Sequence, residues 1–233
     1  MKIALAATTT ALALMPATAA AQAYQCVPPA RVEPVRPALP DGPVRRVPVS
    51  WYKLAISWSP EFCRGRDRSS YQCSGEIGRF GFVLHGLWPE ARSGPPPQWC
   101  ATTPRPSPDV IRRNLCMTPV PWLIEHEWAK HGSCMARTPD AYYRTAAALW
   151  SALRFPDADA LSRKDGLTVG DLRRAFLAVN PGWRADMVAI TPGRGGWLRE
   201  IHLCYDRRQR PMLCPRGQTG AADSTPLKIW RGL

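Results

Sequence analysis

The first strongly apolar stretch after residue 50 has the pattern of a β-strand. Residues 51–58 read Trp-Tyr-Lys-Leu-Ala-Ile-Ser-Trp, which are mostly strand-favouring residues, and Pro60 ends the run. Residues 80–85 form a second candidate strand, which Gly86 follows. Between the two runs, residues 61–78 are polar and charged, so they predict a loop.

Helical spacing dominates the middle of the chain, where capping residues precede apolar stripes. The predicted helices run from Pro108 to about Cys116, from Pro121 to His131, from Thr138 through the stripe of Tyr143, Ala147 and Trp150, and from Thr168 to about Val179. Gly132 is the predicted stop of the second helix. Residues 197–204 and 212–214 then predict a late antiparallel pair of strands. Strands, helices and again strands indicate the α+β class.

The chain begins with the pattern of a signal peptide. A single basic residue, Lys2, precedes an apolar run that ends in small residues, and we expect cleavage after Ala23, with Ala20 or Ala21 as alternatives. An uncleaved anchor is the other interpretation, but threonines and Pro16 interrupt the run, which makes it a poor membrane span. No other segment is apolar enough to span a bilayer. We therefore expect residues 1–23 to direct the protein to the periplasm or the medium.

The remaining chain divides by composition into two parts. Residues 24–49 are rich in Pro, Arg and Val, and we expect an extended, poorly ordered lead-in that Cys26 pins. We call these residues the N-terminal extension. Residues 50–233 are expected to form one folded domain.

Eight cysteines follow the predicted signal peptide. An even number in an exported chain predicts up to four disulfides, although eight cysteines allow 105 pairings. A zinc site is the alternative, but no pair has the spacing C-x-x-C. Because short loops close at low entropic cost, the pairs Cys63–Cys73 and Cys204–Cys214 are the simplest assignments.

The chain is strongly basic. Its formal net charge is +13, and removal of Lys2 with the signal peptide leaves 13 − 1 = +12. Such a charge attracts polyanions such as nucleic acid, lipopolysaccharide and anionic membrane surfaces. Charge alone does not choose among these partners.

Three of the four histidines lie in two short stretches: His85 in one, and His126 and His131 in the other. In a helix, which turns about 100° per residue, Glu127, Lys130 and His131 fall within about 140° of His126. The predicted helix 121–131 therefore presents an acid, an ammonium group and two imidazoles on one face.

These residue types match what RNA cleavage requires. One imidazole can take the proton of the 2′-hydroxyl and another can protonate the leaving 5′-oxygen, because imidazole titrates near neutral pH. Lys130 supplies positive charge for the phosphorane, and Glu127 can orient a neighbouring cation. Since RNA carries its own nucleophile, the reaction needs no metal, no cofactor and no catalytic serine.

Other interpretations were weighed for the same residues. The motif H-E-x-x-H binds zinc through histidines four apart, whereas the position four after His126 is Lys130. Taken singly, His85 could be a structural residue, the helix face could be solvated, and Trp88 could belong to the core. His202 has no partner motif and is interpreted as structural. A basic module that binds RNA or anionic cell surfaces without cutting is the alternative to an enzyme, and it would not need both histidines.

Two stretches resemble the active-site segments of the ribonuclease T2 family. Residues 82–89 read Phe-Val-Leu-His-Gly-Leu-Trp-Pro, and residues 122–134 contain His-Glu-Trp-Ala-Lys-His-Gly-Ser-Cys. Residues 53–58 together with Cys63 resemble the first strand of the family. The resemblance covers most of residues 50–215. It implies an α+β fold with an antiparallel sheet beside several helices.

The resemblance also implies a role for each site residue. His131 would be the base and His85 the acid of the transfer step, and Glu127 and Lys130 would polarise the phosphate and stabilise the phosphorane. His126 would hold the phosphate. The family cuts single-stranded RNA in two stages, through a 2′,3′-cyclic phosphate to a 3′-phosphate, without a metal.

Base recognition and covalent pairing follow from the same resemblance. Trp88 would stack on a base, and stacking tolerates every base. Glu90 stands where many members have Asp, which leaves any base preference open. The resemblance implies the disulfides Cys63–Cys73 and Cys100–Cys134. With the short-loop pair Cys204–Cys214 assigned as above, Cys26 and Cys116 remain for each other. We expect a monomer.

Overall fold

The computed structural model describes residues 23–66, 68–101 and 103–231, so the predicted signal peptide lies outside the described residues except for Ala23. The strands are β1 (Ala23–Tyr24), β2 (Trp51–Trp58), β3 (Arg79–Phe80), β4 (Phe82–Glu90), β5 (Val188–Pro192) and β6 (Leu198–Tyr205). The α-helices are α1 (Ser59–Cys63), α2 (Tyr71–Ser74), α3 (Pro108–Asn114), α4 (Pro121–Lys130), α5 (Pro139–Ser151), α6 (Ala158–Ser162) and α7 (Val169–Val179). Short 3₁₀ turns cover Gly132–Cys134, Ala185–Met187 and Arg194–Gly196. None of the helices in the described ranges is long and apolar enough to cross a bilayer.

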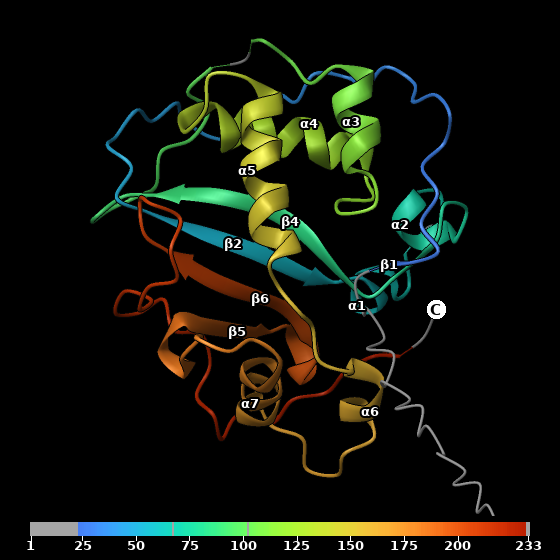
Figure 1. Cartoon of the computed structure of the whole chain (residues 1–233), viewed down its shortest axis with the longest axis vertical. Helices are drawn as coiled ribbons and strands as arrows, with labels where there is room; N and C mark the ends of the chain where they lie inside the picture. Colours follow the sequence, from blue (N-terminus) through green and yellow to red (C-terminus); the bar gives the residue numbers. More distant parts are fainter. Residues whose placement is uncertain (1–22, 67, 102, 232–233) are drawn as a thin grey trace, which may run out of the picture.

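The main sheet is antiparallel, with the strand order β4-β2-β6-β5. Helices α3, α4 and α5 lie on the β4 side of the molecule, and α6 and α7 lie beyond β5 (Figure 1). A separate two-stranded ribbon pairs β1 with β3. The α+β class predicted from the order of elements is confirmed.

Helices α3, α5 and α7 begin where their capping residues predicted, whereas α4 begins at Pro121 without a capping side chain. The side chain of Ser107 accepts a hydrogen bond from the backbone of Val110 at the start of α3. At the start of α7, Thr168 and Asp171 form a reciprocal capping box. These caps satisfy backbone donors that would otherwise lack partners in the first turn.

Three predictions about the strands need correction. Residues 212–214 are not a strand: Pro211 lacks a backbone donor, and only an isolated bridge joins it to Tyr205. Strand β6 instead lies between β2 and β5, and the five residues of β5 are too short a run to identify by periodicity. The predicted strand 80–85 is split between β3 and β4, and β4 continues to Glu90. It tolerates its proline because it is an edge strand.

The predicted loop 61–78 contains two short helices, α1 and α2, which the disulfide Cys63–Cys73 joins. Four disulfides are present: Cys26–Cys116, Cys63–Cys73, Cys100–Cys134 and Cys204–Cys214. They are the expected pairs, of which the family resemblance implied Cys63–Cys73 and Cys100–Cys134. The disulfide Cys26–Cys116 ties the N-terminal extension to the chain after α3.

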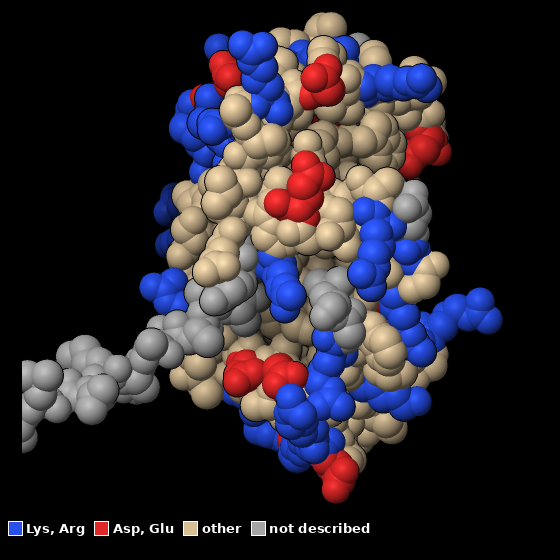
Figure 2. Space-filling view, turned by 90° about the vertical axis from the view of Figure 1, so that its right-hand side faces the viewer, with Lys and Arg blue, Asp and Glu red and all other residues tan. Residues whose placement is uncertain are grey.

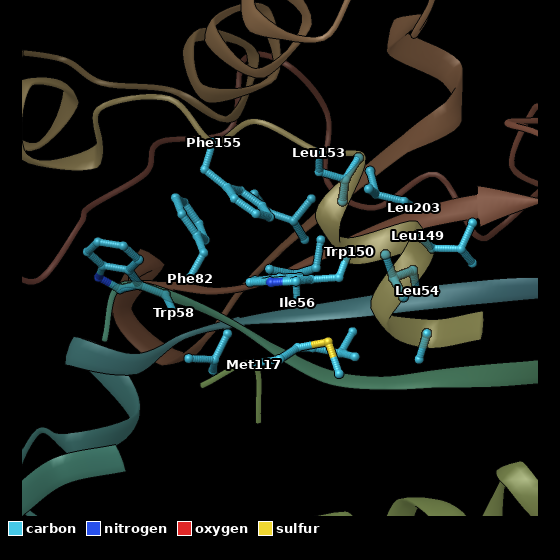
Figure 3. Packing of buried hydrophobic residues seen from close by; sticks show 14 of the residues in the cluster. Leu54, Ile56, Trp58, Phe82, Met117, Leu149, Trp150, Leu153, Phe155 and Leu203 are labelled. Atoms are coloured by element: carbon cyan, nitrogen blue, oxygen red, sulfur yellow. The ribbon is translucent and has the colours of Figure 1, made fainter. Parts of the chain in front are cut away.

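The main core lies between the sheet, α5 and the chain that follows α5 (Figure 3). Alternate residues of β2, namely Leu54, Ile56 and Trp58, point into it, as the period of a strand requires. The ring of Phe82 stacks on that of Phe155 with centroids 4.7 Å apart. Burial of this sheet face leaves the other face available for polar residues.

The N-terminal extension is held at several points rather than at Cys26 alone. Arg112 donates to the carbonyl of Pro29 at 2.8 Å, and Arg45 pairs with Gln98 through backbone hydrogen bonds in both directions. Ala38 is buried in a small cluster with residues of the domain. The extension is therefore ordered against the domain, unlike the poorly ordered lead-in expected from its composition.

Candidate active site

The sheet face opposite the core carries a row of polar side chains. Residues directly opposite each other on antiparallel strands share a face. Ser57 pairs with Glu200 across β2 and β6, and Lys53 pairs with Trp88 across β2 and β4. The polar residues of this face are Lys53, Ser57, His85, Trp88, Glu200 and His202. The order of the strands thus brings together residues more than 100 positions apart.

His85 occupies a β-bulge. The register passes from Leu84 opposite Ile56 to Gly86 opposite Ala55, which leaves His85 as the extra residue. Bulges re-aim side chains, and this one places His85 and Trp88, three positions apart, on the same polar face, while Leu84 and Leu87 both enter the core.

The imidazole of His85 lies between two carboxylates. Its Nδ1 is 2.9 Å from Oε1 of Glu200 and 3.4 Å from the hydroxyl of Ser57. Its Nε2 is 3.5 Å from Oε1 of Glu127. Glu200 therefore fixes the orientation of the ring, and Nε2 faces the helical part of the site.

Gly86 allows the helix to approach this strand. A methyl group on Gly86 would overlap with Oε2 of Glu127 and lie 2.8 Å from Nε1 of Trp88. Gly132 has a similar role, since a methyl group there would lie 2.7 Å from the ring of Trp128. Gly132 was predicted as the residue that ends the helix. Its close packing against Trp128 is a second reason why a glycine occupies this position.

Helix α4 and its C-cap supply His126, Glu127, Lys130 and His131. The indole N–H of Trp88 donates to Oε2 of the buried Glu127 at 2.7 Å. The ring of Trp88 also contacts two imidazoles, with centroids 5.2 Å from His85 and 5.4 Å from His131. Trp88 therefore joins the strand and the helix at the centre of the site.

His126 and Lys130 lie farther along the same helix face. The ring of His126 stacks on the exposed Trp122, with centroids 4.9 Å apart. The ammonium group of Lys130 is 2.6 Å from Oδ2 of Asp41, and the other carboxylate oxygen, Oδ1, accepts a hydrogen bond from the indole of Trp99 at 3.1 Å. A residue of the N-terminal extension thus contacts the proposed catalytic lysine.

The two histidines expected to act as acid and base have opposite electrostatic surroundings. Burial alone would lower the pKa of His85. The hydrogen bond that Glu200 accepts and the negative charges of Glu127 and Glu200 outweigh this effect, so the pKa is raised. Burial lowers the pKa of His131 to about 3, and the nearby charge of Lys130 adds to the effect. These surroundings favour the protonated form of His85 and the neutral form of His131.

The carboxylates also differ. Burial raises the pKa of Glu127 to about 7, although His85 and Trp88 oppose the shift. Glu200 is buried as well, but its hydrogen bonds with His202 and His85 hold its pKa well below the ordinary range. One carboxyl group can thus exchange a proton near neutral pH while the other stays ionised.

Two residues of this site were missed or misjudged from the sequence. Glu200 was not singled out, and His202 was interpreted as structural. In the structure, Nε2 of His202 is 2.9 Å from Oε2 of Glu200, and its ring centroid is 5.6 Å from that of Trp88. The spacing Glu-x-His on the predicted strand 197–204 was the available signal, because such residues share a strand face.

Glu90 lies at the other end of β4 in an ion pair. Its Oε1 is 2.8 Å from the ammonium group of the buried Lys53, which also donates to Gln218 at 3.0 Å. The ammonium group of Lys53 lies 5.9 Å from the ring centre of Trp88. The negative charge of Glu90 is therefore compensated at the edge of the site.

A pocket of about 440 Å³ opens beside His85. Ser57, His85 and Glu200 form one part of its wall, and the aromatic rings of Phe62 and Trp122 form another. Its size suits a nucleotide base or a sugar. Among the described residues, no group of three or more histidine, cysteine, aspartate or glutamate side chains is placed to hold a metal ion.

Fold and site together define a disulfide-bonded α+β protein whose site combines three histidines, a buried glutamate and a lysine. The chain belongs to the ribonuclease T2 family, whose profile matches residues 49–168.

Relatives and solved structures agree with this assignment. A probable ribonuclease of Haemophilus influenzae is 32% identical over 72% of this chain, which spans 62% of the length of that protein. A ribonuclease of Aeromonas hydrophila is 36% identical over 67% of this chain and 72% of its own length. The structure of trichomaglin, a novel S-like ribonuclease, has a TM-score of 0.61 at 19% identity over 78% of this chain and 98% of its own. The last likeness concerns the fold.

Proposed function

We propose that this endoribonuclease cuts single-stranded RNA by transphosphorylation, through a 2′,3′-cyclic phosphate to a 3′-phosphate, without a metal ion or other cofactor. One observation carries the proposal. His85 and His131 flank the ring of Trp88, and their surroundings shift the pKa of the first upward and of the second downward. A charged acid and a neutral base at one site are what this reaction needs.

In the transfer step, neutral His131 takes the proton of the 2′-hydroxyl. The freed oxygen attacks the adjacent phosphorus atom, and the bond from phosphorus to the 5′-oxygen breaks. Protonated His85 gives its proton to that oxygen. An anionic phosphate beside His131 favours its protonated form, so substrate binding strengthens a base whose pKa is low in the free protein.

The other groups of the helix face act on the phosphate. Lys130 supplies fixed positive charge to the phosphorane, and His126 hydrogen-bonds a phosphate oxygen. Glu127, with a pKa of about 7, either accepts or donates a proton at the same oxygens. Because Glu127 is buried, its hydrogen bonds with the phosphate oxygens are stronger than they would be in water.

In the second step the roles reverse. His85, now neutral, takes a proton from water, and the resulting oxygen attacks the cyclic phosphate. His131, now charged, returns its proton to the 2′-oxygen as the ring opens. The product carries a 3′-phosphate, and both histidines regain their starting states.

Low base specificity is part of the proposal. The half-buried ring of Trp88 offers a surface for stacking, which tolerates any base. Glu90, with its charge offset by Lys53, is the second proposed contact of this base site. We further propose that the protein works as a monomer in the periplasm or the medium, where its disulfides persist.

The direct test is digestion of yeast RNA in EDTA, followed by measurement of acid-soluble nucleotides. We expect release by the parent protein and a loss of about 10²–10⁴-fold in His85→Ala and in His131→Ala. Arg113→Ala, which removes an exposed cation of α3, is the control and should keep full activity. Equal release by the parent and both histidine variants would overturn the proposal.

A further inference from the structure

A second groove lies next to the active-site pocket and has no part in the chemistry described above. It encloses about 650 Å³ between the turn after α6, the start of β6 and the C-terminal segment. Its lining includes Lys164, Asp165, Trp197, Lys228, Trp230 and Arg231. We call it the C-terminal groove.

Two indole rings of its lining, with the guanidinium group of Arg64 packed against both, form its most distinctive feature. The rings of Trp197 and Trp230 meet at 86°, with centroids 5.7 Å apart. The guanidinium carbon of Arg64 lies 4.4 Å from the first centroid and 4.5 Å from the second. The ammonium group of Lys228 lies 5.6 Å from the centroid of Trp197. Flat aromatic and guanidinium surfaces beside cations are how proteins hold single-stranded nucleic acid.

The backbone around these side chains is fixed by hydrogen bonds. The indole of Trp58 donates to the carbonyl of Trp230 at 2.8 Å. Leu198 donates to the carbonyl of Lys228 at 2.7 Å, and Lys228 donates to Gly196 at 2.8 Å. Because the backbone is already held in place, binding of a ligand costs little ordering entropy here.

The charge of the groove favours an anion. Glu61 offsets part of the charge of Arg64 at 3.6 Å, and Asp165 adds a negative charge. Within the described ranges, Lys228 and Arg231 have no carboxylate partner. Figure 2 shows the right-hand face of the molecule, where Lys and Arg side chains cluster around its hollowed centre and on its lower half.

The C-terminal groove adjoins the active-site pocket. Phe62, Arg66 and Arg194 line the pocket, and Arg194 begins the turn that leads to Trp197. Trp197 and Glu200 are three positions apart in the chain, a distance of about 10 Å along an extended backbone. Glu200 holds His85, the residue that protonates the leaving 5′-oxygen in the proposed mechanism. The nucleotide on the 3′ side of the cut therefore lies toward the groove.

We propose that the C-terminal groove binds the single-stranded RNA chain on the 3′ side of the cut, a few nucleotides beyond the scissile phosphate. Bases stack on Trp197, Trp230 and the guanidinium group of Arg64, and Lys228 pairs with a phosphate. The direction of the chain rests on the proposed function, because it follows from the role of His85. A lipid surface fits less well, because the indoles lie half-buried within a groove rather than exposed on a convex face.

The test uses DNA strands that contain a single ribonucleotide, so that only one bond can be cut. One strand extends by six deoxynucleotides on the 3′ side of that bond, another extends equally on the 5′ side, and a dinucleotide has neither extension. We expect the 3′ extension to raise kcat/KM about tenfold over the dinucleotide. The double variant Arg64→Ala/Lys228→Ala should lose most of this gain and cut the dinucleotide at the parent rate.

The control is Arg207→Ala/Arg208→Ala, which removes the same charge from exposed residues at the other end of β6. It should retain the gain. An equal loss in both double variants, or no gain from the 3′ extension in the parent protein, would overturn the inference. The inference would also be overturned if Arg64→Ala/Lys228→Ala bound phosphatidylglycerol vesicles less tightly than the parent protein but bound all-DNA strands equally tightly. Failure to cut any strand, the dinucleotide included, would instead contradict the proposed function.

Discussion

At the scale of single residues, the chemistry depends on how one imidazole is held. Glu200 contacts both His85 and His202 and remains ionised. Its negative charge favours the protonated form of His85, which is the form that the proposed mechanism requires. The positive charge of Arg199, the residue just before Glu200, lowers the pKa of His85 and so opposes this effect.

The balance between these neighbours predicts the pH dependence of cleavage. Activity should fall in acid as His131 takes up a proton and in alkali as His85 loses its proton, which gives a bell-shaped kcat/KM profile on a dinucleotide. In Glu200→Gln the pKa of His85 falls, so the alkaline limb should move down by about one pH unit. In Arg199→Gln the limb should move up. A profile that changes monotonically, or variants that move the limb in the same direction, would contradict this assignment.

The close approach of strand and helix at Gly86 predicts a second effect. In Gly86→Ala the new methyl group displaces Glu127, so kcat/KM should fall by about 10²-fold. The free energy of unfolding should drop by about 1–3 kcal/mol, measured by urea denaturation. Gly94→Ala is the control, since it strains a left-handed backbone where no neighbour lies within 4 Å. An equal activity loss in Gly94→Ala would mean that reduced stability, and not the displacement of Glu127, lowers the activity.

The residues of the helix face could be predicted because their spacing lies within one local element. His126, Glu127, Lys130 and His131 fall on or just after α4, as the periodicity of residues 121–131 indicated. Glu200 could not be assigned in this way. Its place beside His85, 115 positions away in the chain, depends on the pairing of β6 with β2.

At the scale of elements, the N-terminal extension is the least expected feature. Its composition indicated a loose lead-in, yet its hydrogen bonds with Arg112 and Gln98 and its disulfide hold it against the domain. Such contacts involve backbone carbonyls, which leave no pattern in a sequence. The four long helices were predicted because capping and apolar spacing are local signals, whereas β5 was missed because five residues are too few to show a period.

Asp41 gives the extension a measurable effect on the site. Its carboxylate, half-exposed, pairs with Lys130 and competes with a substrate phosphate for that charge. Asp41→Asn should therefore lower KM for a dinucleotide about threefold, with little change in stability. Asp140→Asn, which removes an exposed carboxylate from α5, should leave KM unchanged. A higher KM together with a lower kcat in Asp41→Asn would show that the carboxylate holds Lys130 in its working position.

At the scale of the whole molecule, we expect the net positive charge to govern the encounter with RNA. The chain carries a formal net charge of +13, of which the predicted signal peptide contributes one unit. For a long RNA, kcat/KM should fall steeply between about 50 and 200 mM salt, because bound counterions are released on association. A dinucleotide, which contacts fewer cations, should respond much less. A flat response with long RNA would show that the net charge is incidental to binding.

The central claim is that two histidines cut RNA by way of its own 2′-hydroxyl. Mass spectrometry of the products tests it most directly, with a DNA strand containing one ribonucleotide, incubated in EDTA. The histidine mechanism predicts a single cut after the ribonucleotide, first with a 2′,3′-cyclic phosphate end and later with a 3′-phosphate. A 5′-phosphate on the downstream fragment, or cutting of an all-DNA strand, would contradict it.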